Sequence, residues 1–142
     1  MGEHFDPGYQ VHIAAVEERA ASATMLVGTV EGLIVGCATY VSDASSPYGE
    51  GLLPGESSIR MLGVLPEYEG RGVGRALTVE CIARSERDGR EALFLYSNAE
   101  FTRAHGLYLG LGFVRCEERD FRLPERALHL FAFRLRHDAS AQ

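Results

Sequence analysis

The fold is decided by residues 62–77, which read LGVLPEYEGRGVGRAL. Gly70, Gly72 and Gly74 stand at every second position, just before a helical pattern. Because glycine has no side chain, successive backbone N–H groups can converge there on an anion at the positive end of the helix dipole. The turn therefore predicts a pyrophosphate site. The alternative is a flexible turn in which the glycines only satisfy backbone angles.

Two common nucleotide-binding motifs are excluded. No Gly-Lys-Ser/Thr follows the glycines, so the turn is not a phosphate-binding loop of that type. In a dinucleotide fingerprint, the third glycine would fall at Leu77. All 14 basic residues are arginines, which also excludes any mechanism that requires a lysine.

The sequence on both sides of the turn predicts a βαβ unit. Residues 58–65 have the composition of a strand that Pro66 ends, and residues 72–87 carry their apolar side chains on one helical stripe. Residues 92–96 form a continuous apolar run of the kind found in buried parallel strands. The helix would serve as the crossover between the two strands.

The rest of the chain extends the same sheet. We expect a helix at 10–21, a hairpin of 25–30 with 33–41 around Glu31-Gly32, and a long loop at 42–57 that is a candidate substrate lid. We also expect a helix at 102–111 that ends at Gly112 in a left-handed cap, strands at 113–116 and 128–135, and a frayed tail at 137–142. The prediction is a single α/β domain with a mixed sheet over residues 1–142.

The composition is that of a globular protein that binds a small molecule. Of the 142 residues, 46% are hydrophobic, and 20 acidic residues outnumber 14 basic ones. The net charge of −6 disfavours nucleic acid and anionic membranes as partners. No apolar run approaches the roughly 20 residues of a membrane span, and we expect a cytoplasmic protein. Cys37, Cys81 and Cys116 are far apart, so we expect reduced, buried thiols and no metal site.

A second motif lies downstream of the glycine turn. It reads Ala104-x-x-Leu107-Tyr108-x-x-x-Gly112-Phe113, and the run PGESSIRML covers residues 54–62 before the turn. Together with the glycine turn, these motifs resemble the GNAT superfamily of N-acetyltransferases over about residues 24–135. The resemblance implies a mixed, twisted sheet whose central parallel strands splay apart and are flanked by helices. It also implies transfer of an acetyl group from acetyl-CoA to a primary amine, a small molecule or a peptide, by direct attack.

The resemblance assigns the cosubstrate and the acid to particular residues. The pantetheine arm would lie between the splayed strands and pair with backbone groups of Leu62, Gly63 and Val64. The pyrophosphate would be held by Gly70, Arg71, Gly72, Val73, Gly74 and Arg75. Tyr108 would act as the general acid that protonates the departing thiolate, and the alternative is a tyrosine of the core. His105, one helical turn earlier, is a weaker candidate for catalysis.

Three residues depart from the family pattern. Glu69 stands where the family has arginine or glutamine, and its charge would weaken phosphate binding. Phe101 replaces an asparagine at the start of the second helix, and Asn98 would substitute for that asparagine in binding the cosubstrate if it can reach. Ser58 stands where some members carry a glutamate base. Glu56, two residues away on the same strand face, would then be the base through a water molecule, or else it is a solvated loop residue.

These departures leave a non-catalytic module that binds acyl-CoA as the alternative function. The family's first strand and helix also have little room here, so we expect a homodimer in which the partner covers the exposed sheet edge. Finally, we expect the charged residues 118–120 and Arg122 to be solvated, and Met61 and Phe94 to lie in the core.

Overall fold

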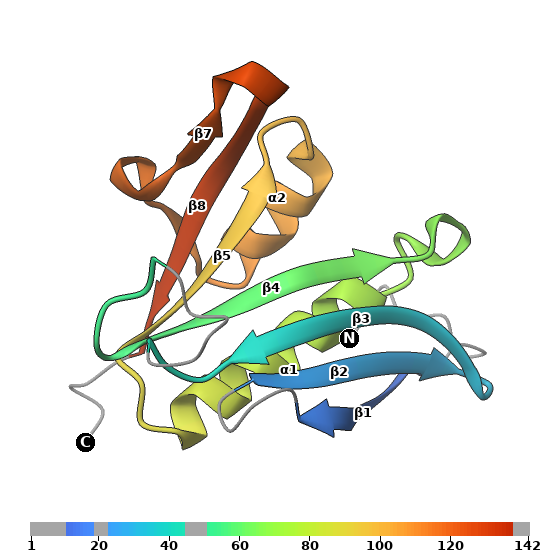
Figure 1. Cartoon of the computed structure of the whole chain (residues 1–142). Helices are drawn as coiled ribbons and strands as arrows, with labels where there is room; N and C mark the ends of the chain where they lie inside the picture. Colours follow the sequence, from blue (N-terminus) through green and yellow to red (C-terminus); the bar gives the residue numbers. More distant parts are fainter. Residues whose placement is uncertain (1–10, 19–22, 45–50, 138–142) are drawn as a thin grey trace.

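The computed structural model describes residues 11–18, 23–44 and 51–137. Its strands form one mixed sheet in the order β1-β2-β3-β4-β5-β8-β6, with β7 paired to β8 (Figure 1). The elements are β1 (Val11–Glu18), β2 (Ala23–Val30), β3 (Leu33–Val41), β4 (Glu56–Val64), α1 (Val73–Arg87), β5 (Ala92–Asn98), α2 (Thr102–Gly110), β6 (Val114–Arg115), β7 (Phe121–Leu123) and β8 (Leu128–Arg136). The predicted α/β fold is confirmed. Neither described α-helix is long and apolar enough to cross a membrane.

The first strand replaces a predicted helix. The prediction of a helix over residues 10–21 is wrong, because Val11–Glu18 forms β1 beside β2. Val11 and Ile13 pack against the core, whereas His12 between them is exposed. This two-residue alternation is that of a half-buried strand. β1 thus covers the edge of β2, which we expected a partner subunit to cover. The homodimer stays a prediction, but the exposed edge no longer supports it.

The hairpin of β2 and β3 has the predicted turn. Glu31 and Gly32 have φ angles of 52° and 81°, and two consecutive positive φ angles are typical of a type I′ turn. The loop after β3 is shorter than predicted, because β4 begins at Glu56. Residues 45–50 of the candidate lid lie outside the described residues.

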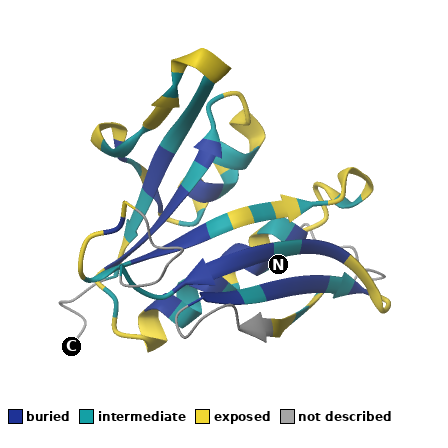
Figure 2. Ribbon diagram, in the orientation of Figure 1, coloured by how far each residue is buried: buried dark blue, intermediate teal, exposed yellow. Residues whose placement is uncertain are grey.

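Both helices pack on one face of the sheet and share one hydrophobic cluster (Figure 2). Leu77 and Cys81 of α1 meet Tyr108 of α2 and Phe133 of β8 in this cluster. The cluster joins the two halves of the sheet, so α1 and α2 hold β4 and β5 in place from the same side.

A glycine in β3 permits the close approach of α1. A Cβ atom on Gly36 would lie 2.8 Å from Val73 Cγ1 and 3.0 Å from the carbonyl oxygen of Gly63. Real Cβ atoms essentially never lie closer than 3.0 Å to another atom, so the first contact would force a shift and the second is tight. Sequence reasoning missed Gly36, whose only signal is an isolated glycine within an apolar strand.

The opposite face of the sheet carries a smaller cluster. Its buried members are Val41, Leu52, Ala92, Phe94, Cys116 and Ala132. Phe94 is buried as predicted, but the prediction for Met61 is wrong, since Met61 is 61% exposed. Cys81 and Cys116 are free and buried as predicted, whereas Cys37 is only partly buried.

The C-terminal end of β8 is tied to the rest of the fold. His137 Nε2 lies 2.7 Å from Ser85 Oγ, which lies 2.7 Å from Ser57 Oγ. The prediction of a frayed tail is therefore wrong at His137, and residues 138–142 lie outside the described residues. These contacts join β8, α1 and β4 at the end of the sheet where β4 and β5 pair.

Candidate active site

The two parallel strands at the centre of the sheet pair briefly and then diverge (Figure 1). Their pairs run from Glu56 with Ala92 to Ile59 with Leu95. Beyond this point β4 follows β3, and β5 follows β8. Residues 60–64 therefore turn a backbone edge toward β5 that has no strand partner in the described part of the chain. The splay implied by the family resemblance is confirmed.

A β-bulge begins where the strands separate. Thr39 of β3 pairs with Arg60 and Cys37 pairs with Gly63, so one residue of β3 faces two residues of β4. Met61, inside the bulge, has a φ of 56° in the left-handed region that non-glycine residues rarely adopt. A bulge bends the strand that carries it. The bend turns β4 away from β5 and explains why Met61 is exposed.

The glycine turn joins β4 to α1. Gly70 and Gly72 have φ angles of 79° and 88°, which favour glycine. Gly72 is the N-cap of α1 without a side-chain cap, and no atom of the residues that the structure describes lies within 4 Å of a Cβ placed on it. The N–H groups of the first helical turn have no intrahelical acceptor, so they are suited to an anion. Glu69, Arg71 and Arg75 are all exposed beside this turn.

Tyr108 lies on α2 with its ring in the larger cluster. The ring centroids of Phe113 and Phe133 lie 6.1 and 5.7 Å from that of Tyr108. Burial raises the pKa of Tyr108 to about 12. Complete transfer of the phenol proton to a thiolate with a pKa near 8.5 is therefore unfavourable. The role that remains open to Tyr108 is a hydrogen bond to the departing sulfur.

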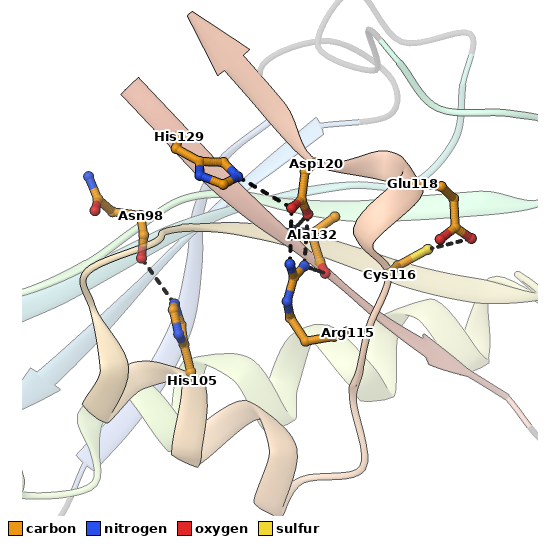
Figure 3. Close-up of polar contacts among 8 residues, drawn as sticks. All are labelled: Asn98, His105, Arg115, Cys116, Glu118, Asp120, His129 and Ala132. Atoms are coloured by element: carbon orange, nitrogen blue, oxygen red, sulfur yellow. Dashed lines mark hydrogen bonds and ion pairs between the residues drawn. The ribbon is translucent and has the colours of Figure 1, made fainter. Parts of the chain in front are cut away.

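His105 and Asn98 order the turn before α2 (Figure 3). His105 Nε2 lies 3.0 Å from the carbonyl oxygen of Asn98, and its ring packs 5.4 Å from that of Phe131. The N–H of Glu100 donates to Asn98 Oδ1 at 2.9 Å. In the structure His105 packs against Phe131, and Asn98 serves the local turn. A catalytic role for His105 and a contact of Asn98 with the cosubstrate stay predictions.

Glu56 lies at the start of β4 in an ion pair with Arg119. Two guanidinium nitrogens of Arg119 donate to the Glu56 carboxylate at 3.0 and 2.8 Å, and the N–H of Leu53 donates at 2.9 Å. Burial by itself raises the pKa of Glu56, but these hydrogen bonds outweigh it and the pKa is lowered. Such a carboxylate is a weak base. The geometry favours an ion-pair role for Glu56 over the predicted role as general base.

Arg119 also covers the smaller cluster. Its guanidinium carbon lies 4.3 Å from the ring centroid of Phe94, and Nη2 donates to the carbonyl oxygen of Gly51 at 3.0 Å. The prediction that residues 118–120 are solvated is therefore wrong for Arg119. Sequence reasoning missed this contact because 63 residues separate Arg119 from Glu56.

The same prediction is wrong for Asp120 (Figure 3). Arg115 donates two hydrogen bonds to Asp120 at 2.7 and 3.0 Å, the N–H of Ala132 donates at 2.8 Å, and His129 Nε2 lies 3.4 Å away. Arg115 lowers the pKa of Asp120 to about 2. A cavity of about 500 Å³ is lined by these side chains and by Glu117, Arg122 and Phe131. Within the described residues, no group of three His, Cys, Asp or Glu side chains is placed to hold a metal.

Arg60 and Tyr96 face each other at the point of divergence, on the side of the sheet away from the helices. They directly follow Ile59 and Leu95, the last parallel pair. Arg60 Nε donates to the buried Ser58 Oγ at 3.0 Å, and the guanidinium carbon lies 6.0 Å from the Tyr96 ring centroid. Sequence reasoning missed both residues, because they differ from other strand residues only in lying where β4 and β5 separate.

Comparison with known proteins identifies a family and a set of relatives. Residues 21–115 match the family model described as the acetyltransferase (GNAT) domain. Mycothiol acetyltransferase from Arthrobacter sp. (strain FB24) is 42% identical over 67 residues, which make up 47% of this chain and 21% of that protein. The chain thus spans about a fifth of the length of the curated relatives it matches.

Solved structures share the fold. A Salmonella typhimurium protein solved with its cofactor acetyl-CoA has a TM-score of 0.65 and 21% identity, over 84% of this chain and 68% of that chain. The ribosomal-protein-S18-alanine N-acetyltransferase from Escherichia coli has a TM-score of 0.69 and 17% identity, over 89% and 94% of the two chains. The family match includes the splayed strands, the glycine turn and α2. The chain therefore belongs to the GNAT family of acetyltransferases.

Proposed function

We propose that this protein transfers an acetyl group from acetyl-CoA to a primary amine. The observation that carries the proposal is the edge of β4 at residues 60–64, which pairs with no strand in the described part of the chain and which the glycine turn joins to the first turn of α1. An extended pantetheine arm would add to this edge as a further strand does, with Leu62, Gly63 and Val64 as its backbone partners. No atom of the described residues lies within 4 Å of a Cβ placed on Gly63, so the sheet face beside this edge is open there.

The pyrophosphate would bind the turn of residues 70–75. Hydrogen bonds from N–H groups to charged phosphate oxygens contribute about 1.5–3 kcal/mol each, so a few of them are enough for micromolar binding. Glu69 opposes the phosphates, and the exposed guanidinium groups of Arg71 and Arg75 offset its charge.

The amine would attack the thioester carbonyl directly. A C–N bond forms, the C–S bond breaks, and the proton that the nitrogen loses ends on the thiolate or in solvent. Tyr108 keeps its proton throughout the neutral range because its pKa is about 12. Its hydroxyl group can therefore donate a hydrogen bond to the sulfur as negative charge develops there. No covalent enzyme intermediate is required.

The ion pair of Glu56 with Arg119 favours a second candidate function. Because this carboxylate is held in an ion pair, the domain could bind acyl-CoA without catalysing transfer. Calorimetry with acetyl-CoA, followed by a thiol-release assay across a panel of amines, separates the two functions. Binding with amine-dependent CoA release supports the transferase, and binding without release by any amine supports the binding module. Absence of binding contradicts both.

A further inference from the structure

We infer that Arg60 and Tyr96 form the subsite that anchors the acceptor, and that they select an amine with a carboxylate a few bonds from its nitrogen. This inference rests on the proposed function, because it concerns the second substrate of the same site. The inference starts from where these two residues lie in the sheet. Arg60 and Tyr96 are the first residues of β4 and β5 after the strands separate.

The two faces of the sheet have different chemistry at this point. Ile59 and Leu95 point into the large cluster beneath the helices, where Tyr108 also lies. Their neighbours Arg60 and Tyr96 lie on the other face, because successive residues of a strand alternate. Tyr96 packs against the smaller cluster. A pantetheine arm between the strands would thus have Tyr108 on one side and Arg60 on the other, so an acceptor would approach past Arg60.

The Arg60 guanidinium is held in place. Its Nε donates to Ser58 Oγ at 3.0 Å, and Ser58 is fully buried in the strand. The guanidinium carbon lies 6.0 Å from the Tyr96 ring centroid, so the group lies beside that ring at the point of divergence. The planar fork of a guanidinium matches the two oxygens of a carboxylate, which a single ammonium cannot match.

The charges on this face also favour an anionic group. The guanidinium carbon of Arg119 lies 4.3 Å from the Phe94 ring centroid. Arg134 of β8 pairs with Phe94 of β5 in the sheet. Arg119 is paired with Glu56. The Nε of Arg134 is buried without a hydrogen-bond partner in the described part of the chain. Arg134 also interacts with the carboxylates of Glu56 and Glu118. Among these described residues, the guanidinium groups of Arg60, Arg119 and Arg134 outnumber the two carboxylates, so their combined charge attracts a carboxylate and disfavours an acceptor with several ammonium groups, such as a polyamine.

The positive charge would also help the reaction. An amine attacks only in its neutral form, and nearby positive charge lowers the pKa of an ammonium group. Arg60 would therefore both hold the acceptor and increase the neutral fraction of its amine, which reduces the need for a carboxylate base. The acceptor class that fits is an amino acid, or a peptide whose N-terminal residue carries a nearby carboxylate.

The test compares matched acceptors on matched variants. Each L-amino acid is assayed beside its carboxamide, which keeps the amine and removes the anionic charge. The wild type is compared with Arg60→Gln, with Arg60→Lys, and with Arg87→Gln as a control at the exposed end of α1. Thermal melts establish that each variant is folded, and calorimetry measures its acetyl-CoA affinity.

We expect the wild type to prefer acids over amides at least tenfold in kcat/KM. Arg60→Gln should lose about 10- to 100-fold on the acids, as expected when a charged hydrogen-bonding partner is removed, and should lose much less on the amides, which share only the effect of the charge on the amine. Arg60→Lys should recover part of the loss, and Arg87→Gln should behave as the wild type. Acetyl-CoA affinity should be unchanged in all of them.

Three outcomes overturn the inference while acetyl transfer itself stands. They are an equal kcat/KM for amino acids and their carboxamides, turnover only with acceptors that lack a carboxylate, and an equal loss of kcat/KM on acids and amides in Arg60→Gln. Acetyl-CoA binding without turnover on any acceptor overturns the inference together with the transferase proposal. A wild type that does not bind acetyl-CoA contradicts the proposed function at its first step.

Discussion

Arg119 holds Glu56 across 63 residues of sequence, with hydrogen bonds of 3.0 and 2.8 Å to the two carboxylate oxygens. The pair lies at the end of the sheet where β4 and β5 are joined, and the strands separate after Ile59. The ion pair therefore fixes the closed end of the splay, and the bulge at Met61 opens the other end.

Replacing Glu56 tests whether its role is structural. We expect Glu56→Gln to lower the free energy of unfolding by about 1–3 kcal/mol, because the partly buried Arg119 loses its counterion. We expect turnover to fall less than tenfold, which is small for the loss of a general base. Urea denaturation and steady-state rates across pH measure the two effects.

Glu80→Gln is the matched control for this variant. Glu80 pairs with Arg84 on the surface of α1, and such a pair contributes only about 0.3–0.5 kcal/mol. A hundredfold loss of turnover in Glu56→Gln at unchanged stability, with loss of the acid limb of the pH profile, would restore Glu56 as the base.

Tyr108→Phe separates catalysis from binding. The ring stays in its cluster and the hydroxyl group is lost, so turnover should fall while acetyl-CoA affinity stays constant. The loss should be near the low end of the roughly 10²–10⁴-fold range for acid catalysis, because the hydroxyl group would donate a hydrogen bond rather than a complete proton. Equal rates for both proteins would make Tyr108 a packing residue.

Gly36→Ala tests the close approach of α1 to β3. The added Cβ would lie 2.8 Å from Val73 Cγ1, so we expect a loss of about 1–3 kcal/mol in unfolding free energy from overpacking. Gly106→Ala is the control, because its Cβ position on α2 has no neighbour within 4 Å among the described residues. That substitution should be neutral or stabilising by up to about 1 kcal/mol. Equal stability of the two variants in denaturant would show that the packing at Gly36 is loose.

The stability of the protein should fall in acid partly through Asp120. Its pKa is about 2 in the folded protein and near 3.8 as an ordinary carboxyl group. The stabilisation is therefore present above about pH 4 and is lost as the pH falls toward 2. With allowance for solvent screening, it should amount to about 1–2 kcal/mol. Asp120→Asn should be less stable than the wild type at pH 7, and the difference should shrink toward pH 2. A constant difference would contradict the assigned role.

Local patterns of sequence predicted the elements whose formation is decided locally. The turn at Glu31-Gly32 and the end of α2 before Gly112 follow from glycines, which tolerate positive φ. The short run of β1 was mistaken for a helix, because its alternation covers only a few residues and two alanines interrupt it. Met61 was expected in the core, since nothing in an apolar strand reveals a bulge.

The charged residues were harder to predict for a different reason. Arg119 and Asp120 stand in a polar run that is typical of solvated loops, yet each is held by partners on other elements. Arg60 becomes a candidate site residue only because β4 separates from β5 directly after Ile59. Long-range pairing decides the roles of these residues, and a single sequence does not reveal such pairing.

The most direct test of the site is a titration of the labelled protein with acetyl-CoA, followed by amide-resolved NMR. We expect saturable binding with the largest shifts at the amides of residues 62–64 and 70–75. Gly74→Asp should bind at least tenfold more weakly, because its carboxylate would face the pyrophosphate. Its Cβ would have ordinary contacts of 3.7 Å to Val64 and 3.9 Å to Leu107, so the fold should persist. Shifts confined to the cavity around Asp120, or unchanged affinity in folded Gly74→Asp, would contradict acetyl-CoA binding between β4 and β5.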